Sequence, residues 1–439
     1  MAQGARGLGT VDASLIVVGS VVGAGIFLVS PSVAREVRSP AAFLATWLLG
    51  GTVALSGALS NGELGGLFPR SGGEYVYLSE AYGPALGFLS GWTAFWIAFP
   101  GSIAALATGF GATLASMLGL GWPGAPKAIG ALAVAALTVV NALGVRSSKW
   151  TQNALSVTKL AAFVVLLGLG LLVSRPGLGG PVPLAGAGGP AGGIAAALVP
   201  VMFAYSGWNA ATYVAGEMRD PSRELGRALA IGTGLCAALY IAVNVVYLRA
   251  MPVYELAQVT DPARVTAVRL GGDVAARFLS PLVAVSILSS LQATVLVGPR
   301  VYQAMAVDRL FFAPLGRTHP ATGAPVVSLG VQAAVSMALL LAERFDELLT
   351  YAMFAIVAFS MFTVAAVFVL RVRRPDLPRP FRVPGYPVVP ALFVAASGWM
   401  LWGVFAHGRG EMLRGCAIVA TGIPAYAAFR ARSKVVRAD

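Results

Sequence analysis

One stretch of the chain, residues 19–27, offers backbone groups rather than side chains for binding. It reads GSVVGAGIF and lies inside an apolar run from about Val11 to Val33. Glycine costs about 1 kcal/mol in a helix interior, so we expect a membrane-spanning helix to break here. Within a bilayer, freed NH and C=O groups are tolerated only against protein or a watery cavity. The stretch therefore predicts a cavity at mid-membrane depth. Close packing of small residues, Gly19 to Gly23, is the alternative.

A second break is predicted in residues 199–209, which read VPVMFAYSGWN. Pro200 removes a backbone NH, and Ser206-Gly207 weakens the helix further. The second break lies five spans after the first, in the sixth predicted span. Two interrupted helices at matching positions of two halves indicate an inverted-repeat transporter and its binding site, which favours a ligand over packing alone.

The composition predicts an all-α polytopic membrane protein. The chain is 57% hydrophobic and 11% charged, and its apolar runs do not alternate with polar residues as barrel strands do. The net charge of +13 falls in short loops, so it fits the positive-inside rule rather than binding to nucleic acid. Cys236 and Cys416 lie in apolar runs, so both are expected to be buried and no disulfide-linked subunit is expected.

About twelve spans are predicted, separated by Pro, Gly and charged clusters. The distribution of Lys and Arg between the loops favours both termini on the inner side. The segment 63–77 is expected to be interfacial, and Glu63 and Glu217 are expected to tie inner loops. The spans are 11–34, 41–67, 84–112, 127–145, 151–173, 192–216, 226–250, 277–306, 325–342, 346–370, 386–406 and 411–430.

Five motifs in this order resemble the amino acid–polyamine–organocation (APC) superfamily, and within it the bacterial relatives of the L-type amino acid transporters. One departure is Gly226, where relatives usually have Pro. The motifs are GAGIF at 23–27, EL at 63–64 with FPRSGGEY at 68–75, FAYSGWN at 203–209, GE at 216–217 with DP at 220–221, and RPFRVPG at 379–385.

The resemblance implies a LeuT-like 5+5 inverted repeat with helices 1 and 6 broken. The first repeat is expected at 1–175, the second at 190–372, two further helices at 385–430 and a cytoplasmic tail at 431–439. A multi-pass protein of the bacterial inner membrane, with both termini cytoplasmic, is implied.

An amino acid needs donors for its carboxylate and acceptors for its ammonium, and broken helices supply both. We expect the NH groups of Ala24, Gly25 and Ile26 to face the carboxylate, with Gly23 allowing close approach. The ammonium is expected to face the carbonyl groups of Val21, Val22, Phe203, Ala204 and Ser206.

Three side chains near the breaks have two interpretations each. Phe203 has the type and place of a gate over substrate, or is a core aromatic. Asn209 lines the side-chain pocket or caps unwound backbone. Tyr240 reaches substrate or Lys159 with its hydroxyl, or makes only interhelical hydrogen bonds.

Lys159 is the only Lys or Arg assigned to the interior of a span, about two turns from its start, because the others within the span bounds lie nearer an end. Such a residue is functional by default, the alternative being a side chain that reaches the inner surface. The resemblance implies that its ammonium takes the place of a sodium ion. It would bridge the first span, near Gly19 to Val22, and the eighth, near Ser286, Ser289 and Ser290. This leaves obligatory exchange, or proton coupling through a neutral lysine.

The expected function is secondary active transport: sodium-independent exchange of small or medium neutral L-amino acids by alternating access. Small residues fill the breaks, and no acid is seen there to hold a cationic side chain. The alternative is a proton-coupled symporter of cationic amino acids or polyamines. An enzyme or a channel is less favoured, and no cofactor or metal is expected, because His319 and His407 lie in loops and no Cys/His ligand spacing occurs. The expected partners are the substrate and the lipid bilayer.

Overall fold

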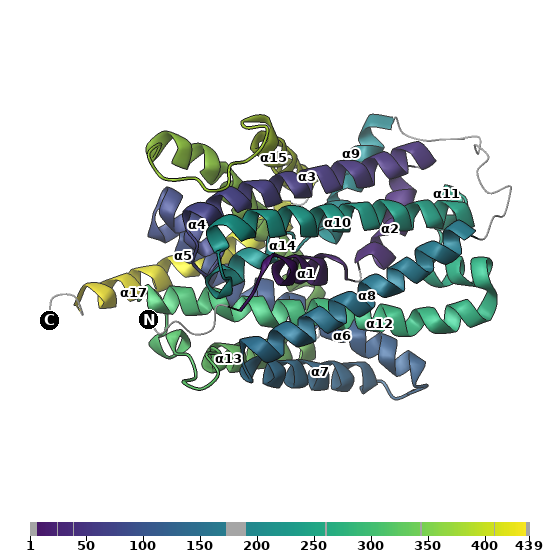
Figure 1. Cartoon of the computed structure of the whole chain (residues 1–439), viewed down its shortest axis with the longest axis horizontal. Helices are drawn as coiled ribbons and strands as arrows, with labels where there is room; N and C mark the ends of the chain where they lie inside the picture. The colour runs from purple at the N-terminus through teal and green to yellow at the C-terminus, as the bar shows by residue number, and fades with distance from the viewer. Residues whose placement is uncertain are drawn as a thin grey trace.

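The computed structural model describes residues 7–23, 25–37, 39–172, 190–259, 261–342, 345–407 and 409–435. These residues are almost entirely helical, and the β pairing among them is a single parallel bridge between Leu8 and Met218. Most long helices run side by side along one direction of the molecule (Figure 1). Helix α4 lies towards one end of that direction and α11 towards the other, and we call these the α4 end and the α11 end. The predicted all-α fold is confirmed.

The helices in chain order are α1 (Thr10–Val21), α2 (Gly25–Val37), α3 (Pro40–Leu67), α4 (Glu74–Tyr82), α5 (Pro84–Thr93), η1 (Ala94–Ala98), α6 (Phe99–Met117), α7 (Ala125–Ala142), α8 (Val145–Leu172), α9 (Pro190–Ala204), η2 (Ala210–Glu217), α10 (Pro221–Ala250), α11 (Val253–Leu256), α12 (Pro262–Val307), η3 (Ala313–Gly316), α13 (Val326–Leu341), α14 (Phe345–Arg373), α15 (Val388–His407), α16 (Arg409–Ala420) and α17 (Gly422–Val435).

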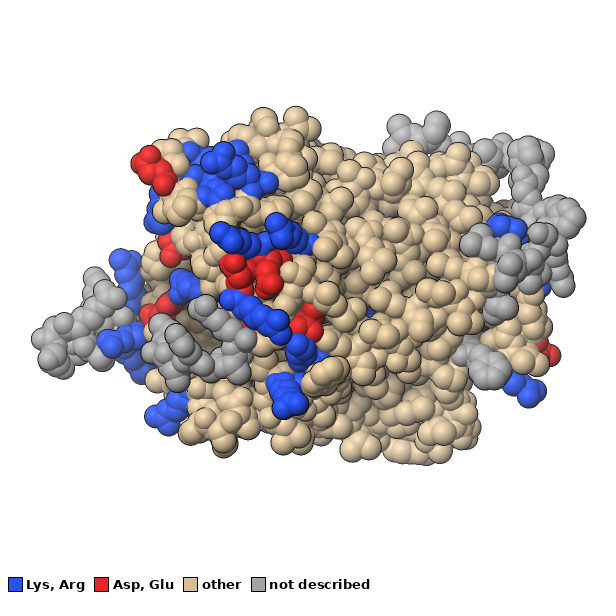
Figure 2. All heavy atoms as spheres, in the orientation of Figure 1, with Lys and Arg blue, Asp and Glu red and all other residues tan. Residues whose placement is uncertain are grey.

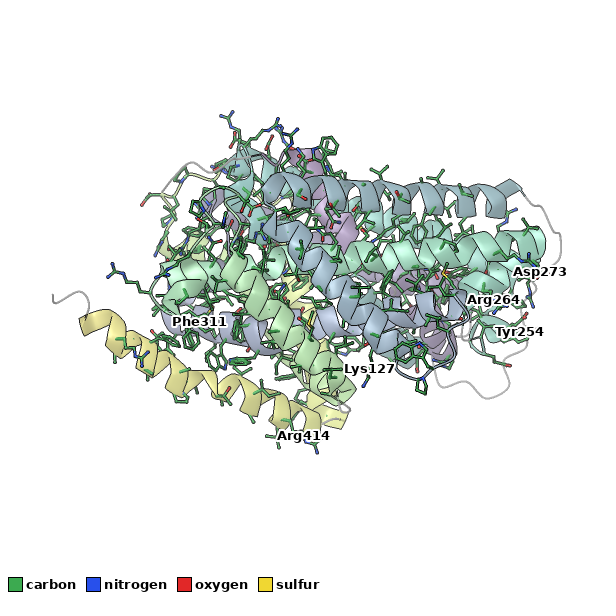
Figure 3. The ribbon with its side chains drawn as sticks, turned by 90° about the horizontal axis from the view of Figure 1, so that it is seen from below. Lys127, Tyr254, Arg264, Asp273, Phe311 and Arg414 are labelled. Atoms are coloured by element: carbon green, nitrogen blue, oxygen red, sulfur yellow. The ribbon has the colours of Figure 1, made fainter. Side chains whose placement is uncertain are left out.

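Among the described residues, seven helical stretches are long and apolar enough to cross a membrane, and four shorter apolar helices accompany them. Figure 2 shows a broad uncharged band across the middle of the molecule, with most of the visible Lys and Arg gathered towards the α4 end. Figure 3 places Tyr254, Arg264 and Asp273 together at the α11 end, away from Phe311. A multi-pass membrane protein has this distribution: polar ends and an apolar belt.

Both predicted breaks are confirmed. Helix α1 ends at Val21 and α2 begins at Gly25, with a bend between them. Helix α9 ends at Ala204, and the chain turns through Tyr205–Asn209 into the 3-10 helix η2. Gly207 has φ +97°, a conformation that other residues rarely adopt, and a Cβ there would lie 2.8 Å from the Ser20 side chain. The two breaks are therefore fixed by local sequence and close packing together.

Two predicted segments differ in the structure. Helix α12 begins at Pro262 rather than at 277, with a bend at Gly272, where φ is +70°. The last predicted span, 411–430, is two helices, because Pro424 in the first turn of α17 cannot continue the α16 ladder. Within the segment 63–77, Tyr75 and Tyr77 are fully buried, and its interfacial position stays a prediction.

The predicted repeat boundaries, 1–175 and 190–372 with later helices at 385–430, stay predictions. Residues 173–189 lie outside the described residues, as do 436–439 of the predicted tail, while α17 continues to Val435.

Helices α6 and α7 cross at two glycines. A Cβ on Gly111 would collide with the Pro126 carbonyl, and a Cβ on Gly130 would lie 2.6 Å from the Ala107 carbonyl oxygen. Both contacts are with backbone, which cannot move aside as a flexible side chain can. This crossing therefore depends on the absence of a side chain, the usual way membrane helices approach closely.

We predict that Gly111→Leu lowers the apparent melting temperature of the detergent-purified protein, because overpacking costs about 1–3 kcal/mol. The matched control is Gly234→Leu in α10, where a Cβ meets nothing within 4 Å. Thermal unfolding monitored by tryptophan fluorescence measures both. Equal melting temperatures for the two variants would contradict the close crossing.

Candidate functional site

A cavity of about 400 Å³ lies between the two breaks and the facing parts of α5, α6, α12 and α14. Its volume is in the range of small-molecule sites. Seven of the predicted substrate-binding residues line it, and so does Ser290 of the predicted lysine site; the seven are Val21, Gly23, Gly25, Phe203, Ala204, Ser206 and Asn209. The cavity that the broken helices predict is therefore present, and both breaks form its wall.

The breaks are in direct contact with each other. A Cβ on Gly25 would lie 2.9 Å from the Ala204 Cα, so the start of α2 lies against the end of α9. The Tyr240 hydroxyl lies 2.7 Å from the Val21 carbonyl oxygen and 3.0 Å from that of Ala204, and donates to both acceptors. One side chain thus joins the carbonyl ends of the two first-half helices.

Tyr240 is held in place by aromatic neighbours. Its ring meets Trp47 edge-on at 5.5 Å and lies 5.0 Å from the ring of Tyr205. Tyr240 is fully buried and does not line the cavity. The structure therefore places its hydroxyl at the junction of the breaks, where the interhelical interpretation applies, and not on the cavity wall.

Lys159 lies about four turns into α8, deeper than the two turns expected, because α8 begins at Val145. The side chain is fully buried, which rules out a position at the inner surface. Its Nζ donates to the Gly19 carbonyl oxygen at 3.1 Å and to that of Val22. The ammonium thus occupies the carbonyl end of α1, where the helix dipole favours a cation.

Two serines of α12 complete this lysine site. Ser290 Oγ lies 3.3 Å from Lys159 Nζ and donates to the Gly19 carbonyl at 2.7 Å, and Ser286 Oγ donates to the Val22 carbonyl at 3.1 Å. Ser289 is not among the partners of Lys159; its hydroxyl lies 3.4 Å from Ser156 Oγ. Three of the four predicted neighbours, Gly19, Ser286 and Ser290, are therefore brought to the lysine or to the carbonyls it holds.

The remaining predicted residues lie elsewhere. The Val22 carbonyl belongs to the lysine site, and Ile26 is fully buried with its carbonyl accepting from Ser30. Ala24 lies outside the described residues. Phe203 lines the cavity with 46% of its surface exposed, which does not fit a core aromatic.

Sequence reasoning missed Glu74, the first residue of α4. It lines the cavity, and its Oε1 accepts from Asn209 Nδ2 at 3.0 Å and from Ser360 Oγ at 2.7 Å. The expectation that no acid lies at the breaks is therefore wrong. Glu74 precedes the second break by more than a hundred residues, so only the mixture of acids, aromatics and glycines in 63–77 drew attention to its segment.

Glu63 and Glu217 tie the loops of the α4 end, as expected. Glu63 is fully buried and pairs with Arg371 at 2.6 Å, while Glu217 pairs with Arg300 at 2.8 Å. Glu63 also accepts from the Val383 backbone NH at 2.8 Å. Both carboxylates are engaged by arginines, although Glu217 Oε2 is buried without a hydrogen-bond partner. Neither lines the cavity, which leaves Glu74 as the acid of the cavity among the described residues.

Comparison with known proteins adds a family to this geometry. A family model described as amino acid permease matches residues 8–412. The chain is 31% identical over 428 residues to the serine/threonine exchanger SteT of Bacillus subtilis, covering 97% of each chain. It is 30% identical to the human b(0,+)-type amino acid transporter 1 over 90% of this chain and 81% of the relative. It is 29% identical to the human large neutral amino acids transporter small subunit 2 over 95% and 79%.

We predict that Tyr240→Phe destabilises the protein by about 1 kcal/mol, because the ring packing stays but two buried carbonyls lose their shared donor. Tyr247→Phe is the matched control: it lies two turns further along α10, and its buried hydroxyl has no hydrogen-bond partner. Chemical or thermal denaturation of the purified protein compares them. An equal loss of stability in Tyr247→Phe would show that the hydrogen bonds of Tyr240 at the junction of the breaks do not stabilise the protein.

Proposed function

The chain belongs to the amino acid permease family of the APC superfamily and is a multi-pass amino acid transporter, and from this premise we propose that it exchanges small and medium neutral L-amino acids without sodium. The observation that carries the proposal is the Lys159 ammonium on the carbonyl end of the first broken helix. A fixed cation there supplies the positive charge that a sodium ion would otherwise bring.

Backbone groups of the breaks are proposed to bind the two charged ends of the substrate. The start of α2 at Gly25 lines the cavity and offers free NH groups and a helix dipole to the carboxylate. The Ala204 carbonyl accepts from Tyr240 and keeps a second lone pair for the substrate ammonium. The Val21 carbonyl accepts from both Tyr240 and the Gly23 backbone NH, so substrate would have to replace one of these donors there. Phe203 is proposed as the gate.

Three lines of support favour neutral substrates of modest size. The cavity of about 400 Å³ is small, and apolar or hydroxyl-bearing residues such as Ala98, Ser102 and Ile287 dominate its wall. The Bacillus subtilis relative, SteT, is a serine/threonine exchanger. Lys159 does not line the cavity, so its charge is not presented to the substrate side chain.

The orientation is also proposed. The α4 end carries Arg70, Arg371 and Arg374, and Figure 2 shows basic side chains gathered there. The positive-inside rule assigns such an end to the cytoplasm of a bacterial inner membrane, which places both termini inside. Cys236 is buried but Cys416 is exposed, contrary to the expectation for the second cysteine, and we still propose that no disulfide-linked subunit is needed.

Counterflow in proteoliposomes tests the exchange function. We expect uptake of labelled serine or alanine only when the vesicles contain unlabelled amino acid, at the same rate in sodium and in choline buffer. Uptake into empty vesicles driven by a sodium gradient would refute the proposal.

We predict that Lys159→Met lowers exchange by at least about tenfold, because charge-assisted hydrogen bonds worth about 1.5–3 kcal/mol to the Gly19 and Val22 carbonyls are lost. The matched control is Lys127→Met at the exposed start of α7 (Figure 3), which should exchange like the wild type. Gel filtration and circular dichroism establish that both variants fold. Wild-type exchange by Lys159→Met would remove the lysine from the mechanism.

A further inference from the structure

Glu74 is a carboxylate that lines the cavity without a cationic partner. It is 8% exposed, and none of the described Lys or Arg residues forms an ion pair with it. Its hydrogen-bond partners, the Asn209 amide and the Ser360 hydroxyl, are neutral and use only Oε1. A buried carboxylate in such surroundings is costly in its ionised form and relieved by a cation or a proton.

The elements packed against Glu74 offer it no other charge. Helix α5 carries no ionisable side chain. Its titratable neighbours are phenols, Tyr77 on α4 itself and Tyr213 on η2. Phenols are neutral near pH 7, and burial raises the pKa of Tyr77 further. The charged groups at the nearby ends of α12 and α14 are engaged elsewhere: Asp308 with Arg70, Arg371 with Glu63, Arg374 with Glu80, and Arg373 with the Ala81 carbonyl.

Two opposing effects act on this carboxyl group. Its position as the first residue of α4 favours the carboxylate through the helix dipole, and so do its two hydrogen-bond donors. Burial favours the protonated acid and is the larger effect, so it raises the pKa of Glu74 to about 7. The side chain is thus able to change its charge near neutral pH.

We propose that Glu74 is a proton-binding site of the transport cavity, and that its bond to Asn209 links protonation to the position of the second broken helix. This inference rests on the proposed function, since it assigns a pH response to the same cavity. Asn209 directly precedes η2, the segment that continues the second broken helix, and Ser360 belongs to α14, so Glu74 connects three separate elements. Any movement of η2 relative to α4 and α14 changes the surroundings of the carboxyl group.

The direction of the linkage follows from burial. Entry of water at this end of the cavity would solvate the carboxylate and return its pKa towards the ordinary value. The arrangement described here therefore binds the proton more tightly, and acid favours it over a water-filled arrangement. Between about pH 6 and about pH 8, a group with this pKa shifts such an equilibrium by about tenfold.

Glu74→Gln tests the proposal, because glutamine keeps an oxygen acceptor for Asn209 and Ser360 but does not titrate. Wild-type serine exchange should change by several fold between about pH 6 and about pH 8, and Glu74→Gln should be flat and resemble the wild type at acid pH. Ser360→Ala removes a donor that stabilises the carboxylate, so its midpoint should move to higher pH. The control Asp220→Asn, an exposed acid of the η2–α10 loop, should keep the wild-type profile.

Infrared spectroscopy of the purified protein gives a second measurement that needs no transport. A carboxylic acid C=O band titrating near neutral pH should be present in the wild type and Asp220→Asn and absent from Glu74→Gln. Absence of that band from the wild type would overturn the proposal. So would a Glu74→Gln variant that keeps the wild-type pH profile and loses only lysine exchange, which would make Glu74 a subsite for a cationic side chain. Absent exchange in every variant refutes the transport function alone, and the infrared band still decides on Glu74.

Discussion

Peptide groups that a helix break frees inside a membrane need hydrogen-bond partners, and most of this structure serves that requirement. Each unsatisfied group in an apolar interior costs several kcal/mol. Here the carbonyls of Gly19 and Val22 are taken by Lys159, Ser286 and Ser290, and those of Val21 and Ala204 by Tyr240. The donors come from α8, α10 and α12. Hydrogen bonds to the freed carbonyls of the two broken helices therefore help to fix the positions of these three helices.

The sequence predicts the features that local chemistry determines. Glycine at 23 and 25, Pro200 and Gly207 weaken a helix wherever it packs, so both breaks are visible without coordinates. A lone lysine in an apolar span is equally visible. The helix bounds do not follow the apolar runs in two segments: α12 begins before its apolar run, and one apolar run contains both α16 and α17. Hydropathy alone therefore gives the wrong helix bounds there.

Residues brought together by tertiary folding are harder to predict. Glu74 belongs to a short helix outside the spans, and only packing against η2 and α14 turns it towards the cavity. Tyr240 illustrates the reverse case: its hydroxyl near the breaks is predicted from the sequence, but whether it faces the cavity or the junction depends on Trp47 and Tyr205. The periodicity of polar residues in a sequence shows which residues share one face of a helix, but it does not show which other element packs against that face.

The bridge between Leu8 and Met218 joins the approach to the first broken helix to the exit of the second. Gly7 and Leu8 donate their backbone NH groups to the Glu217 carbonyl, and Arg219 donates to the Leu8 carbonyl at 3.0 Å. Together with Tyr240, this gives the pair two attachment points far apart along their length. Because the two broken helices are joined at both points, we expect them to move together as one rigid body rather than one without the other.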